Sequence, residues 1–185
     1  MKNILITGRP GIGKTTIIKK IADRLSPDAG GFYTEEIREG KGRVGFSVRD
    51  LDGREGILSH LPTLTAVRQA AGQAKDIRSN CRVGKYYVDV KGFEKVAIPA
   101  LRGALKEKRF IVVDEIGPME EYSREFRSFL EECLNSKKCV IATIKEKGSS
   151  FVQGIRDRED STIFNVSMDN RDMISEEILS KILKW

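Results

Sequence analysis

Two hydrophobic patterns alternate along the chain. Short runs of consecutive apolar residues predict buried strands, and longer segments with apolar residues at helical spacing predict amphipathic helices. The strands are expected at 3–8, 109–116, 138–144 and 161–167, and the helices at 14–25, 92–108, 123–135, 150–157 and 170–184. Pro99 predicts a kink or break in its helix. Continuous apolar strands separated by helices indicate an α/β fold with a mostly parallel sheet and helices on both faces.

The block 31–59 has a different pattern. Three polar-apolar runs are separated by turns at 39–42 and 51–53, and the alternation of Val44, Phe46 and Val48 is typical of a half-buried antiparallel strand. We expect this block to be an insert in the parallel sheet or an extension of its edge. A further strand is expected at 84–90, whereas 60–80 has no clear period and is interpreted as a loop, an insert or a short helix.

Length and charge limit the alternatives. The 185 residues fit a single domain, 1–185. The formal charge is +6, but 33 basic and 27 acidic residues are scattered along the chain. We therefore expect no dedicated nucleic-acid binding, and a positive surface suits a polyphosphate ligand equally well. Nothing in the sequence indicates an oligomer, so a monomer is the simpler expectation.

The cellular location follows from similar arguments. No apolar stretch has the length of a membrane span, and the chain starts with a strand-like run rather than a leader pattern. Cys81, Cys133 and Cys139 lack the spacing of a zinc site and are odd in number, which favours reduced thiols. We expect a protein of the cytoplasm, without membrane contact.

A glycine-rich motif follows the first strand. The segment Gly8-Arg9-Pro10-Gly11-Ile12-Gly13-Lys14-Thr15 matches G-x-x-x-x-G-K-[ST], the phosphate-binding P-loop (Walker A), and Thr16 continues it into the helix. Glycines let backbone N–H groups approach phosphate oxygens closely, and the helix start adds the positive end of its dipole. In this motif Lys14 contacts the β- and γ-phosphates, and the Thr15 hydroxyl is a ligand for Mg²⁺. Because the motif stands between a strand and a helix, the context supports it.

An acidic pair ends the strand at 109–116. Asp114 and Glu115 follow the apolar run Ile111, Val112 and Val113. The carboxyl ends of parallel strands face the ligand crevice, so Asp114 is expected near the Mg²⁺ held by Thr15. Glu115 lies where it can orient a water molecule toward the γ-phosphorus, so Glu115, as the acceptor, and Lys14, as the charge that stabilises the phosphates, are the expected catalytic residues. The alternative is a structural role at the strand end.

Weaker candidates remain at other strand ends. Thr143 can sense the γ-phosphate or the water, although threonine is also simply common in strands. Glu35 and Glu36 end a strand and are rivals to Glu115, or else form surface ion pairs. A transition-state cation is also expected, and four arginines are candidates that the sequence does not rank: Arg9, Arg156, Arg158 and Arg171.

The motifs together resemble the small nucleoside-triphosphatase family of P-loop NTPases, whose animal members are called cancer-related nucleoside-triphosphatase. Six segments carry the resemblance in the family's order, from Ile4 to about Arg171: GRPGIGKTT, GFYTEEIR, RVGFSV, CRVGKYYVD, VVDEIGPME and FNVSMDNRD. The resemblance implies a three-layer RecA-like fold and Mg²⁺-dependent hydrolysis of ATP, GTP and other nucleoside triphosphates with low base specificity.

The resemblance also implies a set of nucleotide contacts. They would fall on Gly8 to Thr16 and on the strand end Ile111, Val112, Val113, Asp114, Glu115, Ile116, Gly117 and Pro118. Members of the family often have lysine at the position of Pro118, so this chain lacks that cation. In RecA-like enzymes the catalytic glutamate can come from the second strand, which keeps Glu35 and Glu36 as alternatives. The rival function is a nucleoside or nucleotide kinase, which uses the same P-loop but transfers the γ-phosphoryl group to a small acceptor.

Overall fold

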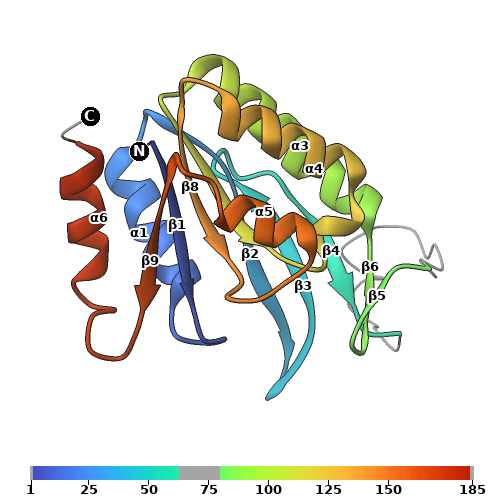
Figure 1. Ribbon diagram of the computed structural model, residues 1–185. Helices are drawn as coiled ribbons and strands as arrows, with labels where there is room; N and C mark the ends of the chain where they lie inside the picture. Colours follow the sequence, from blue (N-terminus) through green and yellow to red (C-terminus); the bar gives the residue numbers. More distant parts are fainter. Residues whose placement is uncertain (1, 63–79, 184–185) are drawn as a thin grey trace.

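The computed structural model describes residues 2–62 and 80–183, and these residues form one nine-stranded mixed sheet (Figure 1). The strands lie in the order β5-β6-β4-β3-β2-β7-β8-β1-β9. The central part is parallel and consists of β1 (Asn3–Gly8), β7 (Phe110–Ile116), β8 (Cys139–Ile144), β9 (Ser161–Val166) and the first residues of β2 (Ala29–Glu39). In this order β8 separates β1 from β7, so the P-loop strand and the acidic strand are not direct neighbours.

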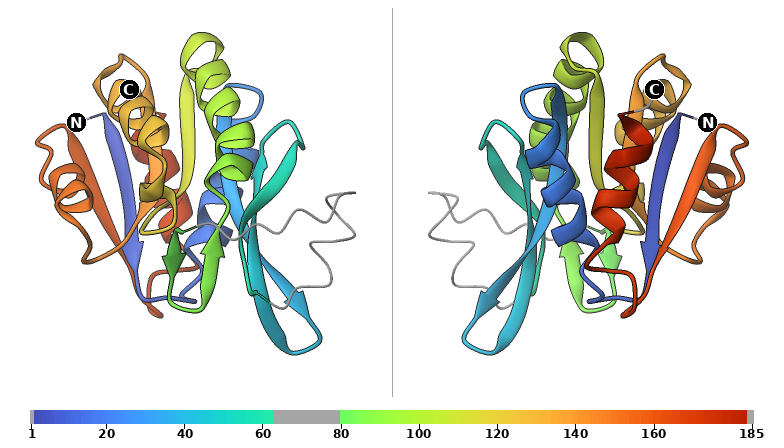
Figure 2. Two further views of the ribbon diagram at one scale, coloured as in Figure 1. Left: turned by 90° about the vertical axis from the view of Figure 1, so that its right-hand side faces the viewer. Right: turned by 90° about the vertical axis from the view of Figure 1, so that its left-hand side faces the viewer.

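Helices cover both faces of the sheet, as Figure 2 shows from two sides. One face carries α1 (Lys14–Leu25) and α6 (Ile174–Ile182), which pack against each other and bury an apolar cluster with Ile4 and Ile6. The other face carries α3 (Val90–Glu107) and α4 (Arg124–Asn135), with α5 (Ser150–Arg156) beside them. Phe32, Phe93 and Phe126 contact one another edge to face in this second cluster. The prediction of a three-layer α/β fold is confirmed.

The antiparallel block forms a wing at one edge of the sheet. It consists of the end of β2, then β3 (Gly42–Asp50), β4 (Glu55–His60), β6 (Tyr86–Val88) and β5 (Arg82–Val83). The sequence left open an insert or an edge extension, and the structure shows the extension. The reason is β2 itself, which pairs in parallel with β7 over Ala29–Phe32 and antiparallel with β3 from Phe32 onward.

Three predictions for the segment 84–108 differ from the structure. Instead of one strand at 84–90 there is a two-strand hairpin that turns at Gly84. The helix α3 begins at Val90 rather than at 92, because the Asp89 side chain caps it by accepting a hydrogen bond from the Gly92 N–H. Pro99 does not break α3. Pro99 has no backbone N–H, so the carbonyl four residues before it has no helical hydrogen-bond partner. Pro99 lies on the exposed side of the helix, so this carbonyl faces water.

The last helix is also shorter than expected. The segment 170–173 forms turns, and α6 spans Ile174–Ile182. A short 3-10 turn, η1 (Glu120–Tyr122), lies between β7 and α4. Most of the segment 60–80 lies outside the described residues, except that His60 belongs to β4. Within the described ranges, no helix is long and apolar enough to cross a membrane.

Candidate functional site

The P-loop lies at the carboxyl end of β1, between that strand and α1. Gly8, Gly11 and Gly13 all have positive φ angles, of 149°, 76° and 107°. At Gly8 there is no room for a side chain, because a Cβ atom would lie 2.7 Å from the carbonyl oxygen of Val166 on β9. The loop therefore needs glycine both for its backbone angles and for its close contact with the neighbouring strand.

Lys14 starts α1 and folds over the loop. Its Nζ donates to the carbonyl oxygens of Gly8, at 2.9 Å, and Arg9, at 3.2 Å. The ammonium group lies at the wall of a cavity of about 1000 Å³ that Pro10, Gly11, Gly13, Thr15 and Thr16 also line. The N-terminus of α1 and a lysine charge thus face the same space, as an anion site requires.

Asp114 ends the apolar run of β7 and is almost fully buried. Its Oδ1 accepts a hydrogen bond of 2.5 Å from the Thr143 hydroxyl, and its Oδ2 lies 3.5 Å from the backbone N of Thr34. Burial raises the pKa of this carboxyl, while hydrogen bonds from Thr143, Thr15 and the Thr34 N–H oppose the rise. Three strands and the first turn of α1 therefore converge on one carboxylate.

Glu115 projects into the cavity beside Asp114. Burial and the neighbouring Asp114 charge raise its pKa, and the Lys14 and Lys145 ammonium groups lower it. Among the described residues Glu115 forms no ion pair within 4 Å. A partly buried carboxylate without a cationic partner, in the same cavity as the P-loop lysine, is suited to accept a hydrogen bond from water.

Glu120 is a site residue that the sequence analysis missed. It is only 4% exposed, yet it lines the same cavity. A Cβ atom on Gly117 would lie 2.9 Å from Oε1 of Glu115 and 3.1 Å from Oε2 of Glu120, so both acids border this glycine. Burial and the Glu115 charge raise the pKa of Glu120 well above its usual range. Because the burial of a loop acid leaves no periodic signal, the sequence could not indicate it.

The rival acids on β2 are ion-paired. Glu35 pairs with Lys19 of α1, whose ammonium lies 3.9 Å above the Tyr33 ring. Glu36 accepts from Arg38 at 2.6 Å and from Arg43 at 2.7 Å, and these hydrogen bonds lower its pKa. Both acids line the cavity at its β2 side, but their charges are already compensated.

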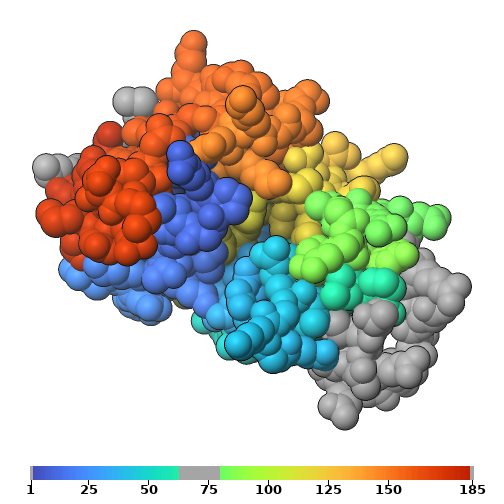
Figure 3. Space-filling view, turned by 90° about the horizontal axis from the view of Figure 1, so that it is seen from below, coloured from blue at the N-terminus to red at the C-terminus, as the bar shows by residue number. Residues whose placement is uncertain are grey.

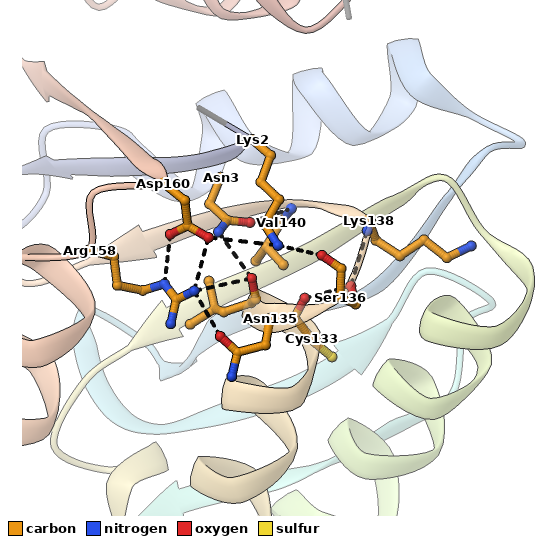
Figure 4. Close-up of polar contacts among 10 residues, drawn as sticks. Lys2, Asn3, Cys133, Asn135, Ser136, Lys138, Val140, Arg158 and Asp160 are labelled. Atoms are coloured by element: carbon orange, nitrogen blue, oxygen red, sulfur yellow. Dashed lines mark hydrogen bonds and ion pairs between the residues drawn. The ribbon is translucent and has the colours of Figure 1, made fainter.

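The arginine candidates lie in different places. Arg156 on α5 donates to the Lys145 carbonyl at 3.0 Å and lies 3.4 Å from the Thr7 hydroxyl, so it connects the ends of β8 and β1. Arg171 lies beyond β9, beside Met168 and Asp172. Arg158 belongs to a polar network with Asp160 at the other end of the parallel strands (Figure 4). The Arg9 side chain is exposed on the loop.

Residues of the β8–α5 connection complete the cavity. Lys145 and Lys147 line its rim together with Pro118, and Figure 3 shows the hollow between the blue P-loop, this orange connection and the cyan β2–β3 hairpin. The sequence analysis considered only arginines as additional cations and missed both lysines, although Lys145 directly follows a predicted strand. The predicted contact residues Ile111, Val112, Val113 and Ile116 have their side chains in the cores, where they position Asp114.

A mixed sheet with a parallel centre, a P-loop at β1, an acidic strand end at β7 and a polar strand end at β8 defines a P-loop nucleotide-binding protein. The comparisons with known proteins agree. The chain matches the family model described as NTPase over residues 3–179. The nucleoside-triphosphatase THEP1 of Thermotoga maritima is 49% identical over 182 residues, which cover 98% of this chain and 95% of the relative. The human cancer-related nucleoside-triphosphatase is 37% identical over 190 residues, with 97% and 95% covered.

Two solved structures share the fold. The crystal structure of THEP1 from the hyperthermophile Aquifex aeolicus superimposes with a TM-score of 0.82 at 37% identity, covering 97% of this chain and 98% of the other. The solution structure of a human cancer-related nucleoside triphosphatase gives a TM-score of 0.79 at 35% identity, with 98% and 97% covered. This chain belongs to the NTPase family. The predictions of that family and of a nucleoside-triphosphate hydrolase are thereby confirmed, and the kinase alternative finds no support.

Proposed function

We propose that this protein hydrolyses nucleoside triphosphates to nucleoside diphosphate and phosphate, with Mg²⁺ and with low base specificity. The observation that carries the proposal is the contrast among the acids of the cavity. Glu115 has no cationic partner within 4 Å among the described residues, whereas Glu35 and Glu36 are held by Lys19, Arg38 and Arg43. An acid that lies near the P-loop lysine and is free to accept from water suits hydrolysis.

The residues present fit Mg²⁺. This ion prefers oxygen ligands and keeps several of its waters, so it needs few protein groups. Within the described part of the chain no group of three or more His, Cys, Asp or Glu residues could hold a metal. The Thr15 hydroxyl and the Asp114 carboxylate, which approach each other at the P-loop, would hold the ion together with the substrate phosphates. Bound there, Mg²⁺ would neutralise charge on the β- and γ-phosphates.

The chain's own groups then divide the chemistry. The backbone N–H groups of the P-loop and the Lys14 ammonium bind the β- and γ-phosphates. Glu115 orients a water molecule, whose oxygen forms the new bond to the γ-phosphorus while the bond from that phosphorus to the β–γ bridging oxygen breaks. The proton that the water loses passes to Oε1 or Oε2 of Glu115. Burial of Glu115 raises its pKa, which makes it a better proton acceptor than a carboxylate in water.

The cellular location and the oligomeric state are further proposals. We infer a cytoplasmic protein, supported by Cys133 and Cys139, which are free thiols rather than members of a disulfide. A monomer remains the expected state, with nucleoside triphosphates as its partners and no dedicated binding of nucleic acid.

The test is phosphate release from ATP, GTP, CTP and UTP with Mg²⁺. The wild-type protein should release phosphate from all four, Lys14→Ala should lose most of that activity, and EDTA should abolish it. Lys20→Ala is the matched control, because Lys20 lies on the same helix but its side chain is exposed and pairs with Glu176. Release by Lys14→Ala at the wild-type rate, or release from a single nucleotide only, would refute the proposal.

A further inference from the structure

The order of the strands indicates on which side of the P-loop the γ-phosphate lies and on which side the nucleoside lies. In the sheet β1 lies between β8 and β9. Asp114 and Thr143 end strands on the β8 side of β1, and Glu115 follows there. Under the proposed function, on which this inference rests, the γ-phosphate therefore faces the β8 side. The phosphate chain is held along the P-loop, so the nucleoside leaves the loop on its other side, toward β9.

The segment that follows β9 lies directly at that side. Gly8 pairs with Val166, the last residue of β9, and the next residues run past the P-loop. In the space-filling view this red-orange segment borders the blue P-loop on the side away from the hollow (Figure 3). Met168 is 64% exposed and Met173 is 73% exposed. Met168, two residues beyond β9, thus presents a large apolar side chain to water on the side where the nucleoside is expected.

Hydrogen bonds fix the shape of this segment. The Ser167 N–H donates to Oδ1 of Asn170 at 2.8 Å, and Nδ2 of Asn170 donates to the Asn165 carbonyl at 2.9 Å. The Arg171 N–H donates to the Ser167 carbonyl at 3.1 Å. The amide of Asn170 is therefore engaged by the backbone. Both polar atoms of this amide thus hold the segment in place.

Arg171 and Met168 lie together on this ordered segment. Nη1 of Arg171 is 3.6 Å from the Met168 sulfur. A guanidinium plane and a thioether can both contact the face of an aromatic ring, the first through its charge and the second through its polarisable sulfur. Every nucleobase has such a face, whereas only hydrogen bonds to base edges distinguish one base from another.

We propose that Met168 and Arg171 form the surface on which the nucleobase of the substrate stacks. This subsite reads the face of the base and not its edges, so it accepts purines and pyrimidines, and purines gain more because their rings are larger. The assignment gives Arg171 a role in nucleoside binding. The transition-state role considered from the sequence requires an arginine on the β8 side of β1.

The test compares Met168→Ala, Arg171→Ala and the double variant with the wild-type protein. Binding of fluorescent ATP and CTP analogues, displaced by the unlabelled nucleotides, gives Kd without any hydrolysis. Each single variant should raise Kd for all nucleotides about two- to fivefold, and the double variant about tenfold. The rise should be larger for ATP and GTP than for CTP and UTP. Leu183→Ala is the matched control, because Leu183 is as exposed as Met168, at 64%, but lies at the far end of α6.

Competition by inorganic tripolyphosphate distinguishes binding at the P-loop from binding at the nucleobase surface. It has no nucleoside, so its competition for the site should be unchanged in Met168→Ala and Arg171→Ala and lost in Lys14→Ala. The inference is overturned if the double variant binds all four nucleotides within twofold of wild type. It is also overturned if Arg171→Ala loses kcat at unchanged Kd, or if Asp169→Ala abolishes a preference for GTP, since that acid would then read a base edge. A wild-type protein that binds nucleotides without releasing phosphate would refute the proposed function and leave this inference standing.

Discussion

The Thr143 hydroxyl donates a 2.5 Å hydrogen bond to Oδ1 of Asp114 and so links β8 to the acidic end of β7. Both residues are buried, so water competes little for this hydrogen bond. The bond fixes the rotation of the carboxylate and directs its other oxygen toward the Thr34 N–H. We therefore expect Thr143 to orient Asp114, in addition to its fit in a strand.

Thr143→Val should weaken the response to Mg²⁺. Valine keeps the shape and the β-propensity but removes the donor, so the Asp114 carboxylate loses its orientation. Loss of such a partner costs about tenfold in metal affinity or activity. The Mg²⁺ concentration for half-maximal phosphate release should rise accordingly, while Thr143→Ser should stay close to wild type. An unchanged Mg²⁺ titration in Thr143→Val would show that the hydroxyl does not orient Asp114.

Glu115→Gln should separate binding from turnover. Glutamine keeps the size of the side chain but cannot accept the proton of the attacking water, which costs about 10² to 10⁴ in rate for a general base. Single-turnover phosphate release should fall by that factor, and the Kd for ATP should stay within about threefold. Glu35→Gln and Glu36→Gln are the controls, because both acids are ion-paired. Loss of turnover in Glu36→Gln with normal turnover in Glu115→Gln would show that Glu36 on β2, and not Glu115, accepts the proton of the attacking water.

Asp160→Asn should lower stability in a pH-dependent way. Arg158 donates to both carboxylate oxygens at 2.9 Å and holds the pKa of Asp160 below its usual value (Figure 4). A lowered folded-state pKa contributes stability that is present above the unfolded pKa and is lost as the pH falls through the folded pKa. The variant should melt about 1–3 °C below wild type at pH 7, and the difference should shrink only below about pH 4.

Thermal unfolding at pH 7, 5, 4 and 3 measures this difference. The kcat for ATP at 25 °C serves as the control readout, because the network lies at the end of the strands away from the P-loop. A melting difference that grows as the pH falls toward 3 would have the wrong sign for a depressed carboxyl pKa.

The two thiols of the α4–β8 region should resist alkylation. Burial raises the pKa of Cys133 and of Cys139 to about 12. The thiolate is the reacting form, so at pH 8 each should react with iodoacetamide about a thousandfold more slowly than free cysteine. Site-resolved mass spectrometry over time measures both rates. The same reaction in guanidinium chloride should reach the rate of free cysteine, and equal rates in folded and unfolded protein would contradict the burial.

The parallel core was predictable because each of its strands is a run of consecutive apolar residues, as in Phe110–Val113, followed by a helical period. The P-loop and the acidic strand end were predictable for a similar reason, since each is a local motif. The wing was harder. The hairpin around Gly84 contains strands of two and three residues, which are too short for alternation to show, and the start of α3 depends on one capping side chain at Asp89.

The site was predictable only where neighbours in sequence are neighbours in space. Lys145 and Glu120 approach Glu115 because η1 and the β8–α5 connection meet above the strand ends, and such proximity follows from tertiary packing. The ion pair of Glu35 with Lys19 joins β2 to α1 and argues against Glu35 as the acid that activates water. No local sequence pattern indicates this pair.

The double pairing of β2 limits how this fold can be divided. A domain inserted into a loop can be removed at two neighbouring points, but the wing here continues one strand of the core without a break. Its strands also cover α3, whose buried face packs on β2, β3 and β4 together. A deletion within 42–60 would therefore open the edge of the sheet and expose apolar side chains of a helix that belongs to the core. The wing and the parallel part of the sheet therefore form one structural unit, with no internal boundary at which the wing could be removed intact.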